Sequence, residues 1–157
     1  MANPLWASRW LSVEREGDGD EFFAASDEVL IVARDTQDNV LLIEEPSPAF
    51  GERALFLPGG AVEPAERIVD AAQRELREET GYRAATLELV ASLRPWPKYL
   101  RVTCHIVRAA GLDHAPLEPD EPHQIIVRRM RVDAICEAIS RGEITDARVA
   151  AALAVCF

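Results

Sequence analysis

The sequence predicts one globular domain of the α/β or α+β class. The chain has 157 residues, which is enough to bury a core, and 48% of them are hydrophobic while 28% are charged. That balance is typical of a folded, soluble chain rather than a disordered one. Short apolar runs of strand length alternate with a few segments of helical periodicity. Strands with interspersed helices indicate a layered sandwich.

The first half of the chain reads mainly as strands and turns. The cluster at 17–20 is rich in Gly and Asp and predicts a turn. The apolar runs 28–33 and 40–43 flank a polar turn, so the pair predicts a β-hairpin. Prolines and a glycine make 46–54 a loop, and 55–57 is a brief strand that ends at a Pro-Gly-Gly sequence.

The clearest helix is expected over residues 65–80. Ile68, Ala72 and Leu76 recur at intervals of four residues and form an apolar stripe. Gly81 follows as a typical C-terminal stop.

The second half alternates strands with two further helices. Strands are expected at 87–93, 100–109 and 124–130, with a turn-rich stretch at 111–122. A second helix is expected from Val132 to Ile139, followed by Gly142. Thr145 is expected to cap a third helix that runs into the apolar tail.

Charge and cysteine content exclude several classes of protein. The formal net charge of −10 argues against nucleic-acid binding, which needs a basic face. The three cysteines are widely spaced, which argues against a disulfide scaffold and a zinc site. No apolar run is long enough to cross a bilayer and no signal peptide is visible, so we expect no membrane partner and a cytoplasmic location.

Three glutamates mark the helix at 65–80 as a candidate metal site. Glu75, Glu78 and Glu79 stand at i, i+3 and i+4 and share one face, where like charges repel. Carboxylate oxygens on a rigid helix suit hard divalent cations, Mg²⁺ or Mn²⁺. Arg74 could pair with Glu78 or with Glu66. The alternative for an isolated cluster of this kind is a solvated acidic helix.

The wider spacing around these glutamates resembles the signature of the Nudix hydrolases. The fixed positions of that box, which spans 60–82, are all matched: Gly60, Glu66, Arg74, Glu75, Glu78, Glu79 and Gly81. Leu76 fills an apolar position, whereas Tyr82 stands where the family has an aliphatic residue. The resemblance implies a single Nudix domain over 1–157. It also implies an α/β/α sandwich with a mixed β-sheet and a catalytic loop-helix-loop.

The resemblance also implies roles for individual residues. Glu75, Glu78 and Glu79 would be metal ligands for Mg²⁺ or Mn²⁺, together with the main-chain carbonyl of Gly59. Glu66 and Arg74 would hold the loop-helix-loop together and orient those ligands.

Several segments resemble the ADP-ribose pyrophosphatase branch of that family. They are the strands around 27–32 and 40–44, Pro97, and the tail 141–148. Glu121 falls where that branch often places a catalytic glutamate on a loop, with Glu118 and Asp120 as nearby competitors. A box glutamate is a further candidate for the base.

Two features depart from the branch. Phe56 replaces an acidic residue near the site, which bears on substrate identity. The N-terminal region is shorter than the branch's usual exchanged sheet, although the homodimer typical of the branch remains an expectation.

The loop at 94–101 holds the expected substrate contacts, which are Arg94, Trp96, Lys98, Tyr99 and Arg101. An aromatic side chain there could stack on a base, and a cation could meet a phosphate or a terminal ribose. The alternative for Trp96 is that it covers the core. Two of the three histidines are lone residues that we read as a strand residue, His105, and a loop residue, His123, rather than as ligands.

The expected activity is metal-dependent hydrolysis of ADP-ribose or a related nucleotide sugar to a nucleoside monophosphate and a sugar phosphate. One alternative is a nucleoside triphosphate pyrophosphatase that cleans the nucleotide pool. Another is a non-catalytic Nudix module that senses a nucleotide sugar. A small-molecule nucleotide is the expected ligand in each case.

Overall fold

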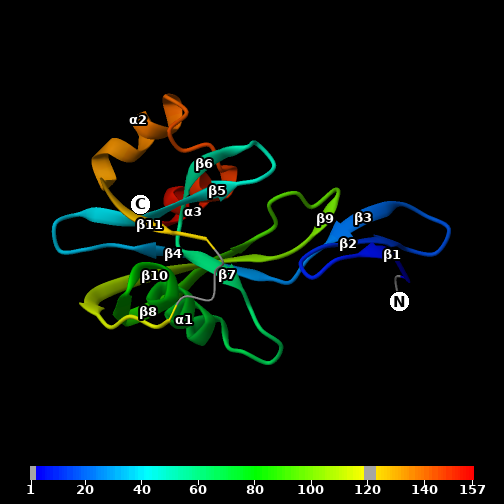
Figure 1. The fold of residues 1–157 in the computed structure, drawn as a ribbon, viewed down its shortest axis with the longest axis horizontal. Coiled ribbons are helices and arrows are strands. Elements are labelled where there is room, and N and C mark those ends of the chain that lie inside the picture. The colour runs from blue at the N-terminus through cyan, green and yellow to red at the C-terminus, as the bar shows by residue number, and fades with distance from the viewer. Residues whose placement is uncertain (1–2, 119–122) are drawn as a thin grey trace.

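The strands within the described residues form three sheets. A computed structural model describes residues 3–118 and 123–157. The sheets have the strand orders β1-β2-β3-β9, β7-β4-β10-β8 and β11-β5-β6 (Figure 1). The elements in chain order are β1 (Asn3–Ala7), β2 (Ser12–Arg15), β3 (Glu21–Ala24), β4 (Glu28–Ala33), β5 (Asn39–Ser47), β6 (Glu52–Phe56), β7 (Gly59–Ala61), α1 (Ile68–Thr80), β8 (Tyr82–Leu93), β9 (Leu100–Arg101), β10 (Cys104–His114), β11 (Ile126–Arg131), a 3-10 turn (Val132–Ala134), α2 (Ile135–Ser140) and α3 (Ala147–Cys156).

The second and third sheets lie between helices on both sides. Successive side chains of a strand point to opposite faces, and β4 follows this rule. Val29 and Ile31 belong to one apolar cluster with residues of α1, whereas Leu30 and Val32 belong to another with residues of α2 and α3. β10 pairs parallel with β4 and antiparallel with β8, so the sheet is mixed. The expected α/β/α sandwich is confirmed (Figure 1).

The predicted hairpin of β4 and β5 is wrong. The turn between them forms, but the two strands share only an isolated bridge between Arg34 and Val40. β4 instead pairs with β7 and β10, and β5 pairs with β6 and β11. Because each strand has other partners on both edges, the two belong to different sheets. Glu28 of β4 and Glu45 of β5, both remote from the turn, line one cavity.

Helix α1 begins at Ile68, three residues later than predicted. Ala65 has a positive φ of 67°, and Arg67 is extended, so neither continues a helix. Gly81 ends the helix as expected: its φ is 76°, and its N–H donates to the carbonyl of Arg77. A left-handed residue of this kind is the usual reason for glycine at a helix end.

Several other boundaries differ from the prediction. Asp146, rather than Thr145, caps α3, and its side chain accepts a hydrogen bond from the backbone N–H of Arg148. The expected loop at 46–54 is shorter, because β5 continues to Ser47 and β6 begins at Glu52. β10 likewise runs on into the expected turn region as far as His114.

The N-terminal sheet projects from the sandwich, toward the right of Figure 1. Its strands β2 and β3 are joined by the turn predicted at 17–20. Large apolar side chains are exposed on this projection, among them Leu5, Trp6 and Trp10. In the part of the chain that the structure describes, no helix is both long and apolar enough to span a membrane.

Candidate functional site

Helix α1 fixes the orientation of the acidic residues through its apolar face. Ala71, Ala72 and Leu76 are fully buried against the sheet. The remaining face of the helix carries Glu75 and Glu78, whose side chains are only 11% and 14% exposed. These carboxylates are therefore not the solvated surface charges of an ordinary acidic helix.

Arg74 joins the acidic residues of the site to one another. Its Nε and Nη2 donate to Oε1 and Oε2 of Glu66 at 3.0 and 2.9 Å. Its Nη1 donates to Glu75 at 2.6 Å and to Glu78 at 3.2 Å. Both pairings considered from the sequence are thus present, together with a third to Glu75.

This network shifts the pKa values of its members. The hydrogen bond from Arg74 holds the pKa of Glu66 below its usual value, against the opposing effect of burial. The same hydrogen bond raises the pKa of Arg74, with Glu75 adding to the effect. Arg74 is therefore a permanent positive charge among three carboxylates.

The loop before α1 is tied to the helix at several points. Nη2 of Arg74 donates to the carbonyl of Ala61 at 3.1 Å. Oε2 of Glu66 accepts from the backbone N–H of Glu63 at 3.0 Å. The backbone N–H of Gly59 donates to Oε2 of Glu79 at 2.7 Å. Together these bonds lock the loop onto the helix.

Two glycines allow the close approach of the loop and the helix. A Cβ on Gly60 would lie 2.5 Å from Oε1 of Glu75. A Cβ on Gly59 would overlap the backbone carbonyl of Val29 on the neighbouring strand. Side chains at either position would therefore displace β7 or the acidic face of α1.

The carboxylate oxygens of this site suit a hard cation, although Arg74 binds some of them in this structure. Over residues 3–118 and 123–157, no three His, Cys, Asp or Glu side chains form a group that could hold an ion by themselves. Glu75 and Glu78 instead both bind Nη1 of Arg74. Their carboxylates and the carbonyl of nearby Gly59 offer oxygen ligands, the kind that Mg²⁺ and Mn²⁺ prefer.

A cavity of about 290 Å³ opens beside Gly59. Phe56, the residue that departs from the related branch, lines it together with the apolar side chains of Leu30 and Leu57. Its polar lining comes from residues that the sequence did not single out, namely Glu28, Glu45, Ser47, Asp146 and Arg148. Three of them lie in segments noted for their resemblance: Glu28 in 27–32, and Asp146 and Arg148 in the tail 141–148.

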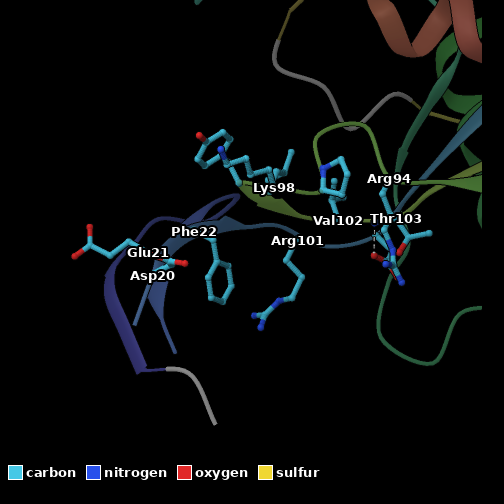
Figure 2. A pocket seen from close by; sticks show the side chains of 12 residues that line it. Asp20, Glu21, Phe22, Arg94, Lys98, Arg101, Val102 and Thr103 are labelled. Carbon is cyan, nitrogen blue, oxygen red and sulfur yellow. Dashed lines mark hydrogen bonds between the residues drawn. The ribbon is translucent and has the colours of Figure 1, made fainter. Parts of the chain in front are cut away.

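Most of the expected substrate contacts line a different cavity, of about 330 Å³ (Figure 2). Its lining includes Arg94, Lys98, Tyr99 and Arg101, together with acidic residues of β3 and its preceding turn. Arg101 pairs with Glu14 at 2.6 Å. Figure 2 shows Arg94 and Thr103 at one end of this cavity and Asp20 and Glu21 at the other.

Trp96 does not line either cavity and does not cover the core. It is 53% exposed and meets Tyr99 edge-on, with the ring centroids 4.9 Å apart. The core role considered for Trp96 is therefore wrong, whereas its role in stacking on a base stays a prediction.

Described residues on either side of the candidate base form hydrogen bonds with the rest of the protein. Glu121 and Asp120 fall outside the described residues, while Glu118 is exposed. Before this segment, Nε of Arg77 donates to the carbonyl of Ala115 at 2.8 Å. After it, Nε2 of His123 lies 2.9 Å from Oε2 of Glu45.

His105 and His123 occupy the kinds of position predicted for them. His123 lies in a loop, and His105 lies on β10, where its Nδ1 is 2.9 Å from Oγ of Ser92.

Comparisons with known proteins agree with this architecture. The NUDIX domain family matches residues 25–153. The ADP compounds hydrolase NudE of Escherichia coli is 29% identical over 126 residues, which cover 80% of this chain and 68% of that protein. The ADP-ribose pyrophosphatase of Mycobacterium tuberculosis is 32% identical over 132 residues, covering 81% of this chain and 63% of that one. The chain thus spans about two thirds of the length of these relatives.

A solved structure extends the similarity to the whole fold. The crystal structure of an ADP compounds hydrolase superposes with a TM-score of 0.82 at 26% sequence identity, covering 99% of this chain and 89% of the other. The match includes the loop-helix-loop and the strands on either side of it. The chain belongs to the NUDIX domain family.

Proposed function

We propose that this protein hydrolyses a nucleoside diphosphate linked to another moiety, in a reaction that depends on a divalent metal. ADP-ribose or a related nucleotide sugar is the substrate, and the products are a nucleoside monophosphate and a sugar phosphate. The observation that carries the proposal is the acidic face of α1, which is bound to the loop through Gly59 and lies beside a cavity. The names of the two relatives, a hydrolase of ADP compounds and an ADP-ribose pyrophosphatase, support this substrate class.

Glu75, Glu78 and Glu79 would hold the metal, Mg²⁺ or Mn²⁺, together with the carbonyl of Gly59. A bound ion supplies charge neutralisation for the diphosphate and lowers the pKa of a water ligand. Glu66 fixes Arg74, and Arg74 in turn fixes the positions of Glu75 and Glu78. When a metal binds, Glu75 and Glu78 would supply oxygen ligands to it, and Glu66 would continue to hold Arg74.

The base that accepts the proton of the attacking water is assigned to Glu121, with Glu118, Asp120 and a box glutamate as alternatives. The described ends of its loop support this assignment, because they attach to α1 through Arg77 and to the cavity wall through Glu45.

The cavity lined by Arg94, Lys98, Tyr99 and Arg101 is proposed to bind the nucleoside half of the substrate. Asp27 connects it to the box, since this residue lines the cavity and its carbonyl accepts a hydrogen bond from the N–H of Val62. Trp96 would contribute through its edge contact with Tyr99.

We further propose that residues 1–157 act as one Nudix domain in the cytoplasm, with no nucleic acid or membrane as partner. The net charge of −10 supports the exclusion of nucleic acid. A homodimer would cover the exposed Leu5, Trp6 and Trp10 of the projecting sheet.

A substrate panel tests the activity. ADP-ribose, other nucleoside diphosphate sugars, dinucleoside polyphosphates and nucleoside triphosphates are incubated with Mg²⁺ or Mn²⁺, and the products are separated by chromatography. AMP and ribose phosphate from ADP-ribose would support the proposal. Pyrophosphate release from a triphosphate would favour the alternative of a nucleotide-pool enzyme. Ligand binding without turnover of any compound would favour a sensing module.

A further inference from the structure

Arg148 forms an ion-paired cluster outside the Nudix box. Its Nη1 donates to both carboxylate oxygens of Glu28, at 2.9 and 2.8 Å. Its Nε and Nη2 donate to the carboxylate of Asp146, at 3.0 and 2.6 Å to Oδ2. Paired contacts of this kind fix a guanidinium in direction as well as in position. Both carboxylates are therefore held rigidly by one side chain.

The fold brings these residues together from opposite ends of the chain. Glu28 begins β4 and lies on the same face as Leu30, the face that packs toward α3. Asp146 caps the first turn of α3, which places Arg148 within that turn. On the other side of Glu28, the Sγ of Cys104 donates to its Oε1 from the neighbouring strand β10.

The environment of the cluster raises the pKa values of Arg148 and Cys104. Burial alone would lower the pKa of Arg148, but the hydrogen bonds to Asp146 and the charge of Glu28 outweigh burial and raise it. Burial and the bond to Glu28 raise the pKa of Cys104 to about 12, so this thiol stays a neutral donor. In formal charges, the cluster has one positive and two negative groups.

The cluster lines the cavity that opens beside Gly59. Glu28, Asp146 and Arg148 all contribute to its wall, and Glu45 contributes from the diverging strand β5. These three carboxylates and one guanidinium carry a formal excess of negative charge. A terminal phosphate would be repelled there, whereas hydroxyl groups would find acceptors. Among the described residues, three hydrogen bonds reach the carboxylate of Glu28. A carboxylate offers about four acceptor sites, so Glu28 can accept from a further donor.

We infer that this cavity receives the hydroxyl-bearing sugar on the far side of the scissile diphosphate, and that Arg148 is the residue that positions Glu28 and Asp146 to recognise it. The inference rests on the proposed function and extends it to the choice of the sugar half. A carboxylate that accepts hydrogen bonds from sugar hydroxyls selects substrates that carry them, because an analogue without hydroxyls forms fewer hydrogen bonds with it. Arg148 acts through these carboxylates, so it is a positioning residue.

The test compares two substrates that share the same diphosphate. ADP-ribose carries the sugar, whereas the β-methyl ester of ADP has the same nucleotide and no sugar. Values of kcat and KM are measured for both, with the wild-type protein and the variants Glu28→Gln, Asp146→Asn, Arg148→Lys and Arg148→Ala. Asp146→Asn retains a good helix cap while losing its charge. Thermal unfolding of each variant reports on its fold.

The expected result is a loss of selectivity. Glu28→Gln, Asp146→Asn and Arg148→Ala lower the ratio of kcat/KM for ADP-ribose over the methyl ester by about tenfold, the size expected for a hydrogen bond to a charged group. The KM for ADP-ribose rises, whereas kcat changes less. Arg148→Lys gives an intermediate ratio, since an ammonium cannot hold two carboxylates with paired hydrogen bonds. The matched control Arg141→Ala, which breaks the exposed pair with Glu137 on α2, leaves the ratio unchanged.

The outcomes separate the inference from the proposed function. A wild-type protein that hydrolyses ADP-ribose, with folded Glu28→Gln and Arg148→Lys variants that keep the wild-type ratio, would overturn the inference alone. A purely structural role for Arg148 would give this pattern, with lower melting temperatures and no change in selectivity. A wild-type protein that hydrolyses neither substrate would overturn the proposed function, and the inference with it.

Discussion

The backbone N–H of Gly59 and the carboxylate of Glu79 are joined by a hydrogen bond of 2.7 Å. The bond connects the first residue of β7 to the last turn of α1. It places the backbone of Gly59 beside an acidic side chain. The geometry of the whole candidate site depends on this contact, so the first prediction concerns the glycines that permit it.

Gly59→Ala and Gly60→Ala should have different effects. A Cβ at Gly59 would meet the rigid backbone of Val29, so we expect a loss of about 2–3 kcal/mol of unfolding free energy. A Cβ at Gly60 would meet the side chain of Glu75, which can turn away. Gly60→Ala should therefore keep most of the stability and lose metal affinity. Denaturant unfolding and calorimetric titration with Mn²⁺ measure the two quantities, and equal stability losses would contradict this difference.

Glu79→Gln should retain the fold and lose most of the activity. The amide oxygen of the glutamine can still accept the hydrogen bond from Gly59, while a charged metal ligand is removed. We expect the rate at saturating Mg²⁺ to fall by more than the roughly 10–100-fold that is typical when an outer-shell partner of a metal site is lost. Steady-state kinetics check this, with circular dichroism as a control for folding. Turnover close to that of the wild-type protein would remove Glu79 from the catalytic machinery.

Glu66 should contribute stability that depends on pH. Its pKa in the folded protein lies below the ordinary value of 4.5, mainly because of its hydrogen bond with Arg74. The contribution is therefore fully present above pH 4.5, and it disappears as the pH falls through the lower, folded-state value.

The measurement compares the unfolding free energies of the wild-type protein and Glu66→Gln between pH 7 and pH 3. We expect the wild-type protein to be more stable at pH 7, with the difference shrinking below about pH 4.5. Glu137→Gln is the control, because that residue forms an exposed pair with Arg141. A difference in unfolding free energy that grows on acidification would contradict the lowered pKa of Glu66.

Glu121→Gln should lower kcat with little change in metal affinity. A base on the loop accepts a proton from the attacking water, whereas the metal is held by α1. We expect the acidic limb of the pH–rate profile to change in this variant, and metal titration to give the wild-type affinity. Glu118→Gln is the comparison on the same loop. An unchanged rate and pH profile would move the base to Asp120 or to a box glutamate.

The sequence predicts the local parts of the site well. The positions of Glu75, Glu78 and Glu79 follow from helical spacing alone, and the turn at Gly81 follows from the need for a left-handed residue. Arg74 is within reach of Glu78 on the same helix, which made their pairing foreseeable. Interactions of this range depend on a single element and its caps.

The long-range parts could not be predicted from one sequence. The turn between β4 and β5 looks like a hairpin, but β4 finds its parallel partner in β10, far along the chain. Arg148 meets Glu28 across 120 positions, and nothing in the spacing of either residue indicates the other. These pairings are decided by which strands and helices pack together. The cavity beside Gly59 is therefore a property of the fold.

The most direct test of the central claim is the rate of AMP release from ADP-ribose as Mg²⁺ is added to metal-free protein. We predict no release without the metal, and a saturable rise with Mg²⁺ that yields AMP and ribose phosphate in equal amounts. A rate that does not depend on divalent metal, or no release with either Mg²⁺ or Mn²⁺, would contradict the account.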